Sequence, residues 1–242
     1  MKYSIDVDFD FTTDTENYWE LNNDPDAYSP TLKEYHQILW QKKLPNNEFF
    51  SLNIGNSSYN YLYWKNFRFG ADSIINMYTH HKNAYIKKVL LDVKKRIKDY
   101  DQFRKEYIKK SYTIGGNIIF PKNGVANSIN VARGRHPKIM DRFDLTLECI
   151  RRYYNNETSP LTTVLNNNSE YFHLFNSFRG YVEFFYLQDL VIDDYSKVNF
   201  YLNFNDFLDN PYPSNADEWF ILYNNQMDFL RKRNQRIDSL FR

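Results

Sequence analysis

The segment from residue 128 to residue 152, SINVARGRHPKIMDRFDLTLECIRR, holds the densest group of side chains that could carry out chemistry. Between residues 133 and 152 the basic residues are five arginines and one lysine, whereas residues 82–110 carry nine lysines and two arginines. A guanidinium offers two parallel donors that match a carboxylate or a phosphate, and a lysine cannot imitate them. We therefore predict a pocket for a phosphate-bearing ligand, either a nucleotide or a nucleic acid, lined by Arg133, Arg135, Arg142, Arg151 and Arg152.

Four further residues of this segment could act as acids or bases. Helical spacing places Asp141, Asp144 and Glu148 on one face, where carboxylates could exchange protons with a ligand. His136 lies at the predicted start of a helix and could be a general base or a phosphate contact. Structural roles stay open for these residues. Glu148 precedes Arg152 by four residues, as in a ladder of ion pairs along a helix. His136 could be a capping residue, as a lone histidine in a loop often is.

The same arginines allow a different interpretation, in which their role is structural. Paired with Asp141, Asp144 and Glu148, they would form an internal network of salt bridges that locks a helix to a loop. The protein would then be a non-catalytic structural or partner-binding module. The sequence does not decide between this scaffold and the ligand pocket, so the questions of enzymatic activity and of a cofactor stay open.

Three candidate ligand-binding residues lie far from this segment: His36, Trp40 and Lys43. His36 falls on the apolar stripe of a predicted helix, beside Trp40. This position is also typical of a histidine in the core whose hydrogen bonds are satisfied. The sequence contains no GxxxxGKS/T, GxGxxG, HExxH or GxSxG motif. Its single cysteine, Cys149, excludes a disulfide framework and a cysteine-based zinc site, and we predict no metal site.

The elements that must position these residues are mostly helices. Ser29-Pro30 is typical of a helix start, with serine as the N-cap and proline at the first helical position. Apolar residues three and four positions apart predict further helices at 82–110, at 137–154, and in a final stretch that begins near Ser214.

Short strands complete the predicted fold. Alternating residues predict strands within 48–70 and a buried strand at 118–121. Asp72 or Ser73 is expected to cap a short helix that runs through His80. The acidic segment 1–28 alternates like a strand at residues 3–11 and is expected to pack on the rest of the protein. We predict an α+β fold, a single and mostly helical globular domain over residues 1–242 with a small antiparallel sheet of short strands.

Charge and composition limit the partners. The chain has 31 basic and 30 acidic side chains, so no global field would attract a nucleic acid or a membrane. Segment 82–110 carries a net charge of +7, which we interpret as a solvated helix face rather than a nucleic-acid arm. Aromatic residues make up 19% of the chain, which A/T-rich codons explain without a binding surface. The lack of a signal-peptide pattern and of any run of 18 apolar residues predicts a cytoplasmic protein, not a membrane protein.

Several blocks of the sequence resemble a bacterial family of unknown function. They are IGGNIIFP, SINVARG, HPKIMDRFDLTLECIRRYY, SPL and GYVEFFYLQDLV, preceded by YHQILWQKKLPN and FGADSI. The resemblance covers residues 24–238. The sequence departs from the family pattern at Asn47, where the family has glycine, and at Gly70 or Ala71, where it has serine. The resemblance implies a free-standing bacterial protein and supplies no activity, cofactor or catalytic residue. The oligomeric state stays open.

Overall fold

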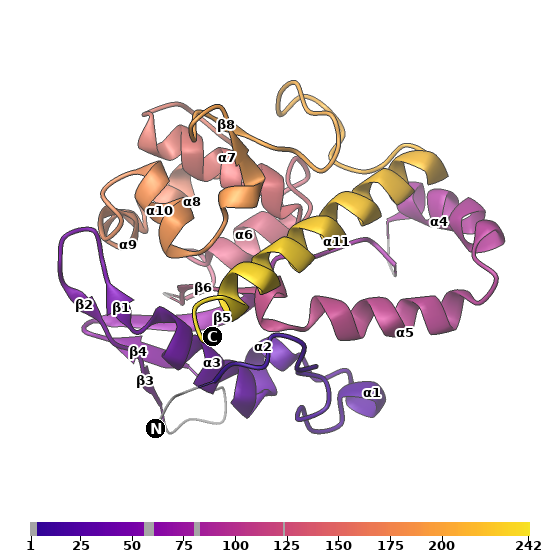
Figure 1. Ribbon diagram of the computed structural model, residues 1–242. Coiled ribbons are helices and arrows are strands. Elements are labelled where there is room, and N and C mark those ends of the chain that lie inside the picture. Colours follow the sequence, from indigo (N-terminus) through magenta and orange to yellow (C-terminus); the bar gives the residue numbers. More distant parts are fainter. Residues whose placement is uncertain (1–3, 56–60, 80–82, 123) are drawn as a thin grey trace.

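The computed structural model describes residues 4–55, 61–79, 83–122 and 124–242 (Figure 1). Its helices are α1 (Tyr18–Leu21), α2 (Pro25–Tyr28), α3 (Pro30–Trp40), α4 (Ala84–Arg96), α5 (Tyr100–Ser111), α6 (Ile129–Arg135), α7 (Phe143–Tyr154), α8 (Thr162–Asn166), α9 (Ser169–His173), α10 (Phe178–Phe184) and α11 (Ala216–Asp238). Its strands are β1 (Lys42–Lys43), β2 (Phe49–Phe50), β3 (Asn53–Ile54), β4 (Leu62–Trp64), β5 (Phe67–Ser73), β6 (Asn117–Pro121), β7 (Val191–Ile192) and β8 (Lys197–Val198). Two 3₁₀ turns are η1 (Ile114–Gly116) and η2 (Gln188–Leu190).

The largest sheet has four antiparallel strands in the order β3-β4-β5-β6, and two separate hairpins pair β1 with β2 and β7 with β8. The β5–β6 register places Ala71 opposite Ile119 and Asp72 opposite Ile118. All five residues of β6 are buried. The prediction of an α+β fold with a small antiparallel sheet is therefore confirmed, as is the buried strand at 118–121.

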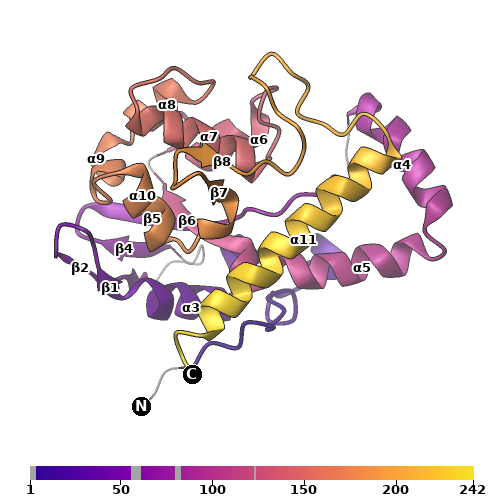
Figure 2. The same ribbon diagram turned by 45° about the horizontal axis from the view of Figure 1, so that its top comes forward.

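Helices cover both sides of this sheet. In Figures 1 and 2 the helices α7 to α10 lie above the strands and α3 lies below them. The first two turns of α7, from Phe143 to Ile150, are buried all round, and they include the polar residues Asp144 and Glu148. A helix this enclosed can hold such side chains only where partners are supplied for them. None of the described helices is long and apolar enough to cross a membrane.

The long C-terminal helix α11 runs diagonally across the molecule from α4 toward the sheet (Figure 2). It begins one residue later than the predicted cap at Ser214, since the Asn215 side chain is the N-cap and accepts a hydrogen bond from the Glu218 N–H at 3.0 Å. The Glu218 carboxylate in return accepts from the Ser214 N–H at 2.7 Å. The predicted start at Ser29-Pro30 is confirmed, because Ser29 Oγ accepts from the Leu32 N–H at 3.1 Å.

Two predicted helices have the wrong bounds. The helix expected at 137–154 begins only at Phe143, because Met140 and Asp141 adopt left-handed backbone angles, with φ of 46° and 67°. A right-handed helix cannot contain such residues. The helix expected at 82–110 is divided into α4 and α5, which are separated by Ile97 in an extended conformation and by Asp99, whose backbone is not helical either.

Two further expectations are wrong. Residues 4–11 form turns instead of a strand, because side chains of this acidic segment form hydrogen bonds with its own backbone. For example, Asp6 Oδ1 accepts a hydrogen bond from the Asp8 N–H at 3.0 Å. The segment still packs on the body, where Phe11 is fully buried and its N–H donates to the Tyr112 carbonyl at 3.0 Å. Asp72 belongs to β5 and caps no helix, and residues 74–79 are not helical. His80 lies outside the described residues.

Candidate functional site

The side chain of Arg133 lies inside the protein against two carboxylates from other segments. Only 1% of it is exposed, and its Nη1 lies 2.8 Å from Asp72 Oδ2 and 2.6 Å from Asp141 Oδ1. Its Nε donates to Thr146 Oγ1 at 3.2 Å, and its Nη2 donates to the Asp141 carbonyl at 3.0 Å. Arg133 therefore ties α6 to β5 and to the turn that precedes α7.

Arg142 and Asp144 form a second buried pair. The Arg142 guanidinium contacts both carboxylate oxygens of Asp144, with 3.1 Å between Nε and Oδ1. Its Nη1 donates to the Pro211 carbonyl at 3.0 Å, and Asp144 Oδ2 accepts from the Tyr201 N–H at 2.9 Å. This pair fixes the start of α7 to the segment 201–211, so neither side chain is available to a ligand.

Glu148 accepts hydrogen bonds from two arginines one turn further along α7. Arg151 contacts both of its oxygens, at 2.8 and 2.9 Å, and Arg152 Nε lies 2.8 Å from Oε1. The Arg152 guanidinium also lies over the Phe207 ring, 4.8 Å from its centroid. The ion-pair ladder that the sequence allows between Glu148 and Arg152 is therefore present.

The structure does not gather the five arginines around one cavity. Arg133 and Arg142 are buried against different carboxylates. Arg151 and Arg152 share one glutamate, and Arg135 is exposed at the end of α6. This geometry favours the scaffold interpretation of the cluster. The pocket for a phosphate-bearing ligand stays a prediction.

The distant candidates lie mainly in the core. His36 is fully buried, and Trp40 Nε1 donates to its Nδ1 at 2.9 Å. Burial, followed by the nearby charge of Arg233, lowers the pKa of His36 to about 3. His36 is therefore neutral near pH 7 and pairs with Trp40 inside the protein. Lys43 is exposed on β1, whereas the neighbouring Lys42 lies over the Trp40 ring at 5.3 Å from its centroid.

His136 has a capping role at the end of α6. Its backbone N–H donates to the Ala132 carbonyl at 2.9 Å, and its Nδ1 accepts from the Lys138 N–H at 3.2 Å. Partial burial, followed by the charge of Lys138, lowers the pKa of His136. Nδ1 is thus already engaged by the chain, and these contacts suit a structural role.

Four aspartates from three segments surround the region beside Arg133. We call this region the acidic cleft, and its carboxylates are those of Asp24, Asp26, Asp72 and Asp141. Asp24 caps α2 by accepting from the Asp26 N–H at 3.1 Å. Asp26 Oδ2 accepts from the Ser73 N–H at 2.7 Å, which joins α2 to the end of β5. The acidic cleft is thus built by contacts between elements that are distant in the sequence.

A cavity of about 400 Å³ opens within the acidic cleft. Its walls come from α2, β5, α6 and the ends of β4 and β6, and they include Asp24, Asp26, Tyr61, Asp72, Lys122 and Asn130. Two wall residues each have a buried oxygen without a hydrogen-bond partner among the described residues, namely Asp26 Oδ1 and Asn130 Oδ1. A buried acceptor left in this state costs about 1–3 kcal/mol. Donors on a ligand would remove that cost.

The acidic cleft changes the protonation of its own carboxylates. Burial raises the pKa of Asp72 to about 7, with Arg133 lowering it and Asp141 raising it again. Burial, then the charges of Asp24 and Asp72, raise the pKa of Asp26 well above its ordinary value. A carboxyl group with the pKa of Asp72 can take up or release a proton near neutral pH. In the described part of the chain, no cluster of histidine, cysteine, aspartate and glutamate is suited to a metal ion.

The position of Asp141 is fixed by a strained turn. Met140 and Asp141 both have left-handed backbones, which cost on the order of 1 kcal/mol or more each for residues other than glycine. Tyr78 Oη donates to the Met140 carbonyl at 2.6 Å, and the Asp141 N–H donates to the Arg133 carbonyl at 3.1 Å. Asp141 Oδ2 also accepts from Asn76 Nδ2 at 3.1 Å. These contacts hold the Asp141 carboxylate beside Arg133.

Sequence reasoning identified Arg133 and Asp141 but missed their partners. In the sequence, Asp24-Pro25-Asp26 has the composition of a turn. The feature of this segment that could have indicated a ligand site is its pair of carboxylates at the start of α2. Asp72 gave a clearer signal, since it is a charged residue that follows the apolar alternation of residues 67–71. The sequence analysis also missed Arg233, which is buried in α11 and donates to the carbonyls of Gly115, Asn117 and Phe185.

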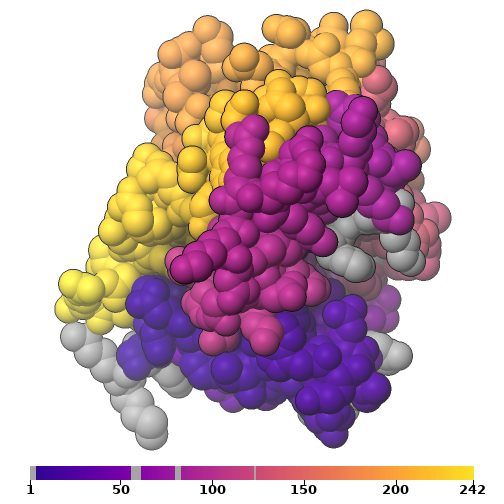
Figure 3. Space-filling model, turned by 90° about the vertical axis from the view of Figure 1, so that its right-hand side faces the viewer, coloured from indigo at the N-terminus to yellow at the C-terminus, as the bar shows by residue number. Residues whose placement is uncertain are grey.

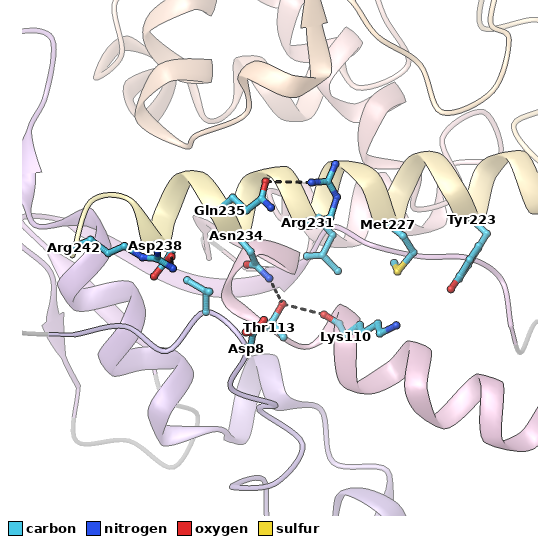
Figure 4. A pocket seen from close by; sticks show the side chains of 12 residues that line it. Asp8, Lys110, Thr113, Tyr223, Met227, Arg231, Asn234, Gln235, Asp238 and Arg242 are labelled. Atoms are coloured by element: carbon cyan, nitrogen blue, oxygen red, sulfur yellow. Dashed lines mark hydrogen bonds and ion pairs between the residues drawn. The ribbon is translucent and has the colours of Figure 1, made fainter.

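A second cavity, of about 520 Å³, lies along α11 (Figure 4). Three of its five charged side chains already have partners, since Arg242 pairs with Asp238 and Arg231 donates to Gln235 at 3.2 Å. Asn234 likewise donates to Thr113 Oγ1 at 3.1 Å. The acidic cleft therefore remains the better candidate for a ligand site.

Comparison with known proteins gives a family without an activity. The model of a family of unknown function, DUF6994, matches residues 5–237. No curated protein and no solved structure matches the chain.

Proposed function

We propose that this chain, which belongs to the DUF6994 family of unknown function, binds a small organic cation in its acidic cleft. The ligand would carry a primary ammonium or a guanidinium group. The observation that supports this proposal is one cavity lined by Asp24, Asp26 and Asp72, in which two wall residues, Asp26 and Asn130, each have a buried acceptor oxygen without a partner among the described residues. An ammonium has three N–H donors and a guanidinium has five, and neither has an acceptor, so both match this wall.

Charge supports the same class of ligand. The acidic cleft contains four aspartates. The basic residues near enough to lower the pKa of Asp72 are Arg133 and Lys122. A ligand with one or two positive charges would balance the excess and would favour the ionised aspartates. A phosphate would instead meet the carboxylates and the unpartnered oxygens, all of which repel it.

The pKa of Asp72 predicts how binding depends on pH. Asp72 has a pKa of about 7, so it is largely protonated at pH 6 and largely ionised at pH 8. A cation binds the ionised form more strongly, and binding therefore releases protons near pH 7. Affinity for an organic cation should rise from pH 6 to pH 8. A group with this pKa is also equipped for general acid–base chemistry, although no reaction is assigned here. A bacterial, cytoplasmic setting forms part of this proposal.

The test is a thermal-shift and calorimetric screen of the full chain with ethylammonium, guanidinium, a diamine, inorganic phosphate and AMP. We expect the organic cations to raise the melting temperature of the wild type more at pH 8 than at pH 6. Asp26→Asn should weaken cation binding at least tenfold, and Asn130→Ala should weaken it as well. Asp101→Asn, the same change at an exposed position on α5, should have no effect.

Stabilisation by phosphate or AMP but not by the cations would overturn this proposal in favour of the phosphate-bearing ligand. Equal cation binding by the wild type and by both cleft variants would also overturn it, because the ligand would then lie elsewhere. Melting curves without ligand show whether each variant is folded.

A further inference from the structure

The helices α4 and α5 and the turn between them carry an unusual number of lysines that have no acidic partner. We call this set the lysine face, and it consists of Lys87, Lys88, Lys94, Lys98, Lys105, Lys109 and Lys110. All seven are exposed, and none forms an ion pair with a carboxylate of the described residues. By contrast, Lys95 on α4 pairs with Asp92 at 2.8 Å, and Arg96 pairs with Asp217 at 2.5 Å. Positive charge therefore exceeds what the protein itself neutralises here.

The fold holds the lysine face in a fixed position. The opposite side of α4 buries Ile86, Val89, Leu90 and Val93, and α4 packs on α11. α5 buries Tyr107, whose hydroxyl accepts from the Met77 N–H at 3.2 Å. Figure 1 shows α4 and α5 together at one end of the molecule, and Figure 3 shows that they cover much of the face seen there. The lysines thus project from a packed surface rather than from a loose tail.

A hollow of about 520 Å³ accompanies the lysines on α4. It is lined by Lys87, Lys88 and Lys94, with Leu90 and Leu91 among its apolar walls. Lys87 and Lys94 are seven residues apart, or two helical turns, so they stand on the same side of α4 about 10 Å apart. This spacing suits an extended partner with repeated negative charges better than a single small anion.

Charge is separated along the chain. The whole chain has a net charge of +1 and segment 82–110 has +7, so the rest of the chain carries −6. A nearly neutral protein therefore presents one strongly basic region. Such regions attract polyanions at long range and raise association rates at low salt.

The net charge of segment 82–110 alone indicates only a solvated helix face, but the lysines of the lysine face form no ion pair with a described carboxylate and are held in fixed positions. We therefore propose that the lysine face binds the phosphate backbone of a nucleic acid without reading its sequence. Lysine contacts phosphates as a point charge, and a set of lysines supplies affinity that does not depend on bases. Protein–protein interfaces are depleted in lysine, which disfavours a protein partner. Binding in the interfacial plane of a membrane requires several exposed apolar side chains among the basic ones. On α4 the large exposed apolar residues are Tyr85 and Leu91.

The test is fluorescence anisotropy of the full chain with a labelled 20-base-pair DNA duplex and a 20-nucleotide RNA, each in two unrelated sequences. We expect binding in 50 mM salt that is similar for both sequences and weakens steeply as salt increases. The triple variant Lys87→Gln, Lys88→Gln, Lys94→Gln should bind at least tenfold more weakly. The slope of log affinity against log salt should also fall by about three, because each phosphate contact contributes about one.

A matched control makes the same charge change elsewhere, with Lys65→Gln, Lys197→Gln and Lys232→Gln at exposed positions. This variant should retain wild-type binding. If the α4 variant does not fold, as judged by its melting curve, the α5 variant Lys105→Glu, Lys109→Glu tests the same surface. Three results would overturn the proposal: no binding by the wild type in 50 mM salt, equal losses in the test and control variants, or tight binding to vesicles of anionic lipid with none to nucleic acid.

Discussion

Buried charges in this protein are compensated in different ways at the level of single residues. Arg133 contacts two carboxylates, Arg142 contacts one, and Arg233 donates only to backbone carbonyls, at 2.7 to 3.2 Å. Burial lowers the pKa of Arg233 to about 10. A buried guanidinium is retained at low cost only where its donors are satisfied, so each of these arginines constrains the segments around it.

Replacing Arg133 by lysine should destabilise the protein, even though the charge is kept. A single ammonium cannot contact Asp72, Asp141 and Thr146 as the planar guanidinium does. We expect a loss of about 2–4 kcal/mol in the free energy of unfolding, measured by urea denaturation. The control Arg135→Lys changes an exposed residue and should alter it by less than about 0.5 kcal/mol. Equal effects of the two changes would contradict a structural role for Arg133.

His36 should make the protein sensitive to acid. Its pKa is about 3 in the folded protein and near 6.5 in an unfolded chain, so the unfolded state takes up the proton first as pH falls. The stability that neutral His36 contributes is complete above about pH 6.5. It is lost progressively toward pH 3, by up to about 4 kcal/mol.

The test replaces His36 by glutamine, whose side-chain oxygen can still accept from Trp40 Nε1. The free energy of unfolding is then measured at several values between pH 7 and pH 4.5. The variant should lose less stability than the wild type over this range, although it starts lower. Parallel pH profiles of the two proteins would show that another group controls acid unfolding.

At the level of elements, local signals in the sequence predict helix starts well. The Ser29-Pro30 start is correct and the final helix starts one residue from its predicted cap, because the capping side chain lies within three residues of the N–H that it binds. The start of α7 was misplaced for a different reason. Apolar periodicity continues through residues 137–142, but Arg133 and Tyr78 hold Met140 and Asp141 in left-handed conformations through contacts that periodicity does not encode.

Removing one of these caps should weaken the protein measurably. Ser29 is buried, accepts from the Leu32 N–H and donates to Asp14 Oδ1 at 2.7 Å, so Ser29→Ala leaves two groups without their partner. We expect a loss of about 1–2 kcal/mol in the free energy of unfolding. Chemical denaturation can measure it beside Ser214→Ala, an exposed serine outside α11, which should cost less than about 0.5 kcal/mol. A similar cost for both serines would contradict this role of the Ser29 cap.

At the level of the whole molecule, the fold class could be predicted and the candidate site could not. The balance of helical and alternating patterns identifies an α+β fold, because those patterns are local. The acidic cleft joins Asp24 and Asp26 on α2 with Asp72 on β5 and Asp141 before α7. No short motif links these positions, and each aspartate alone has the appearance of a turn or cap residue. Only the packing of α2 against β5 and the burial of Arg133 create the site.

The contacts of Arg233 also bear on how the protein is made. Its guanidinium donates to the carbonyls of three residues: Gly115 in η1, Asn117 in the edge strand β6, and Phe185 just after α10. During translation those carbonyls leave the ribosome long before residue 233 does. The contacts that join α11 to η1 and β6 therefore form only after residue 233 has left the ribosome, so this part of the core assembles later than the strands and helices that precede α11.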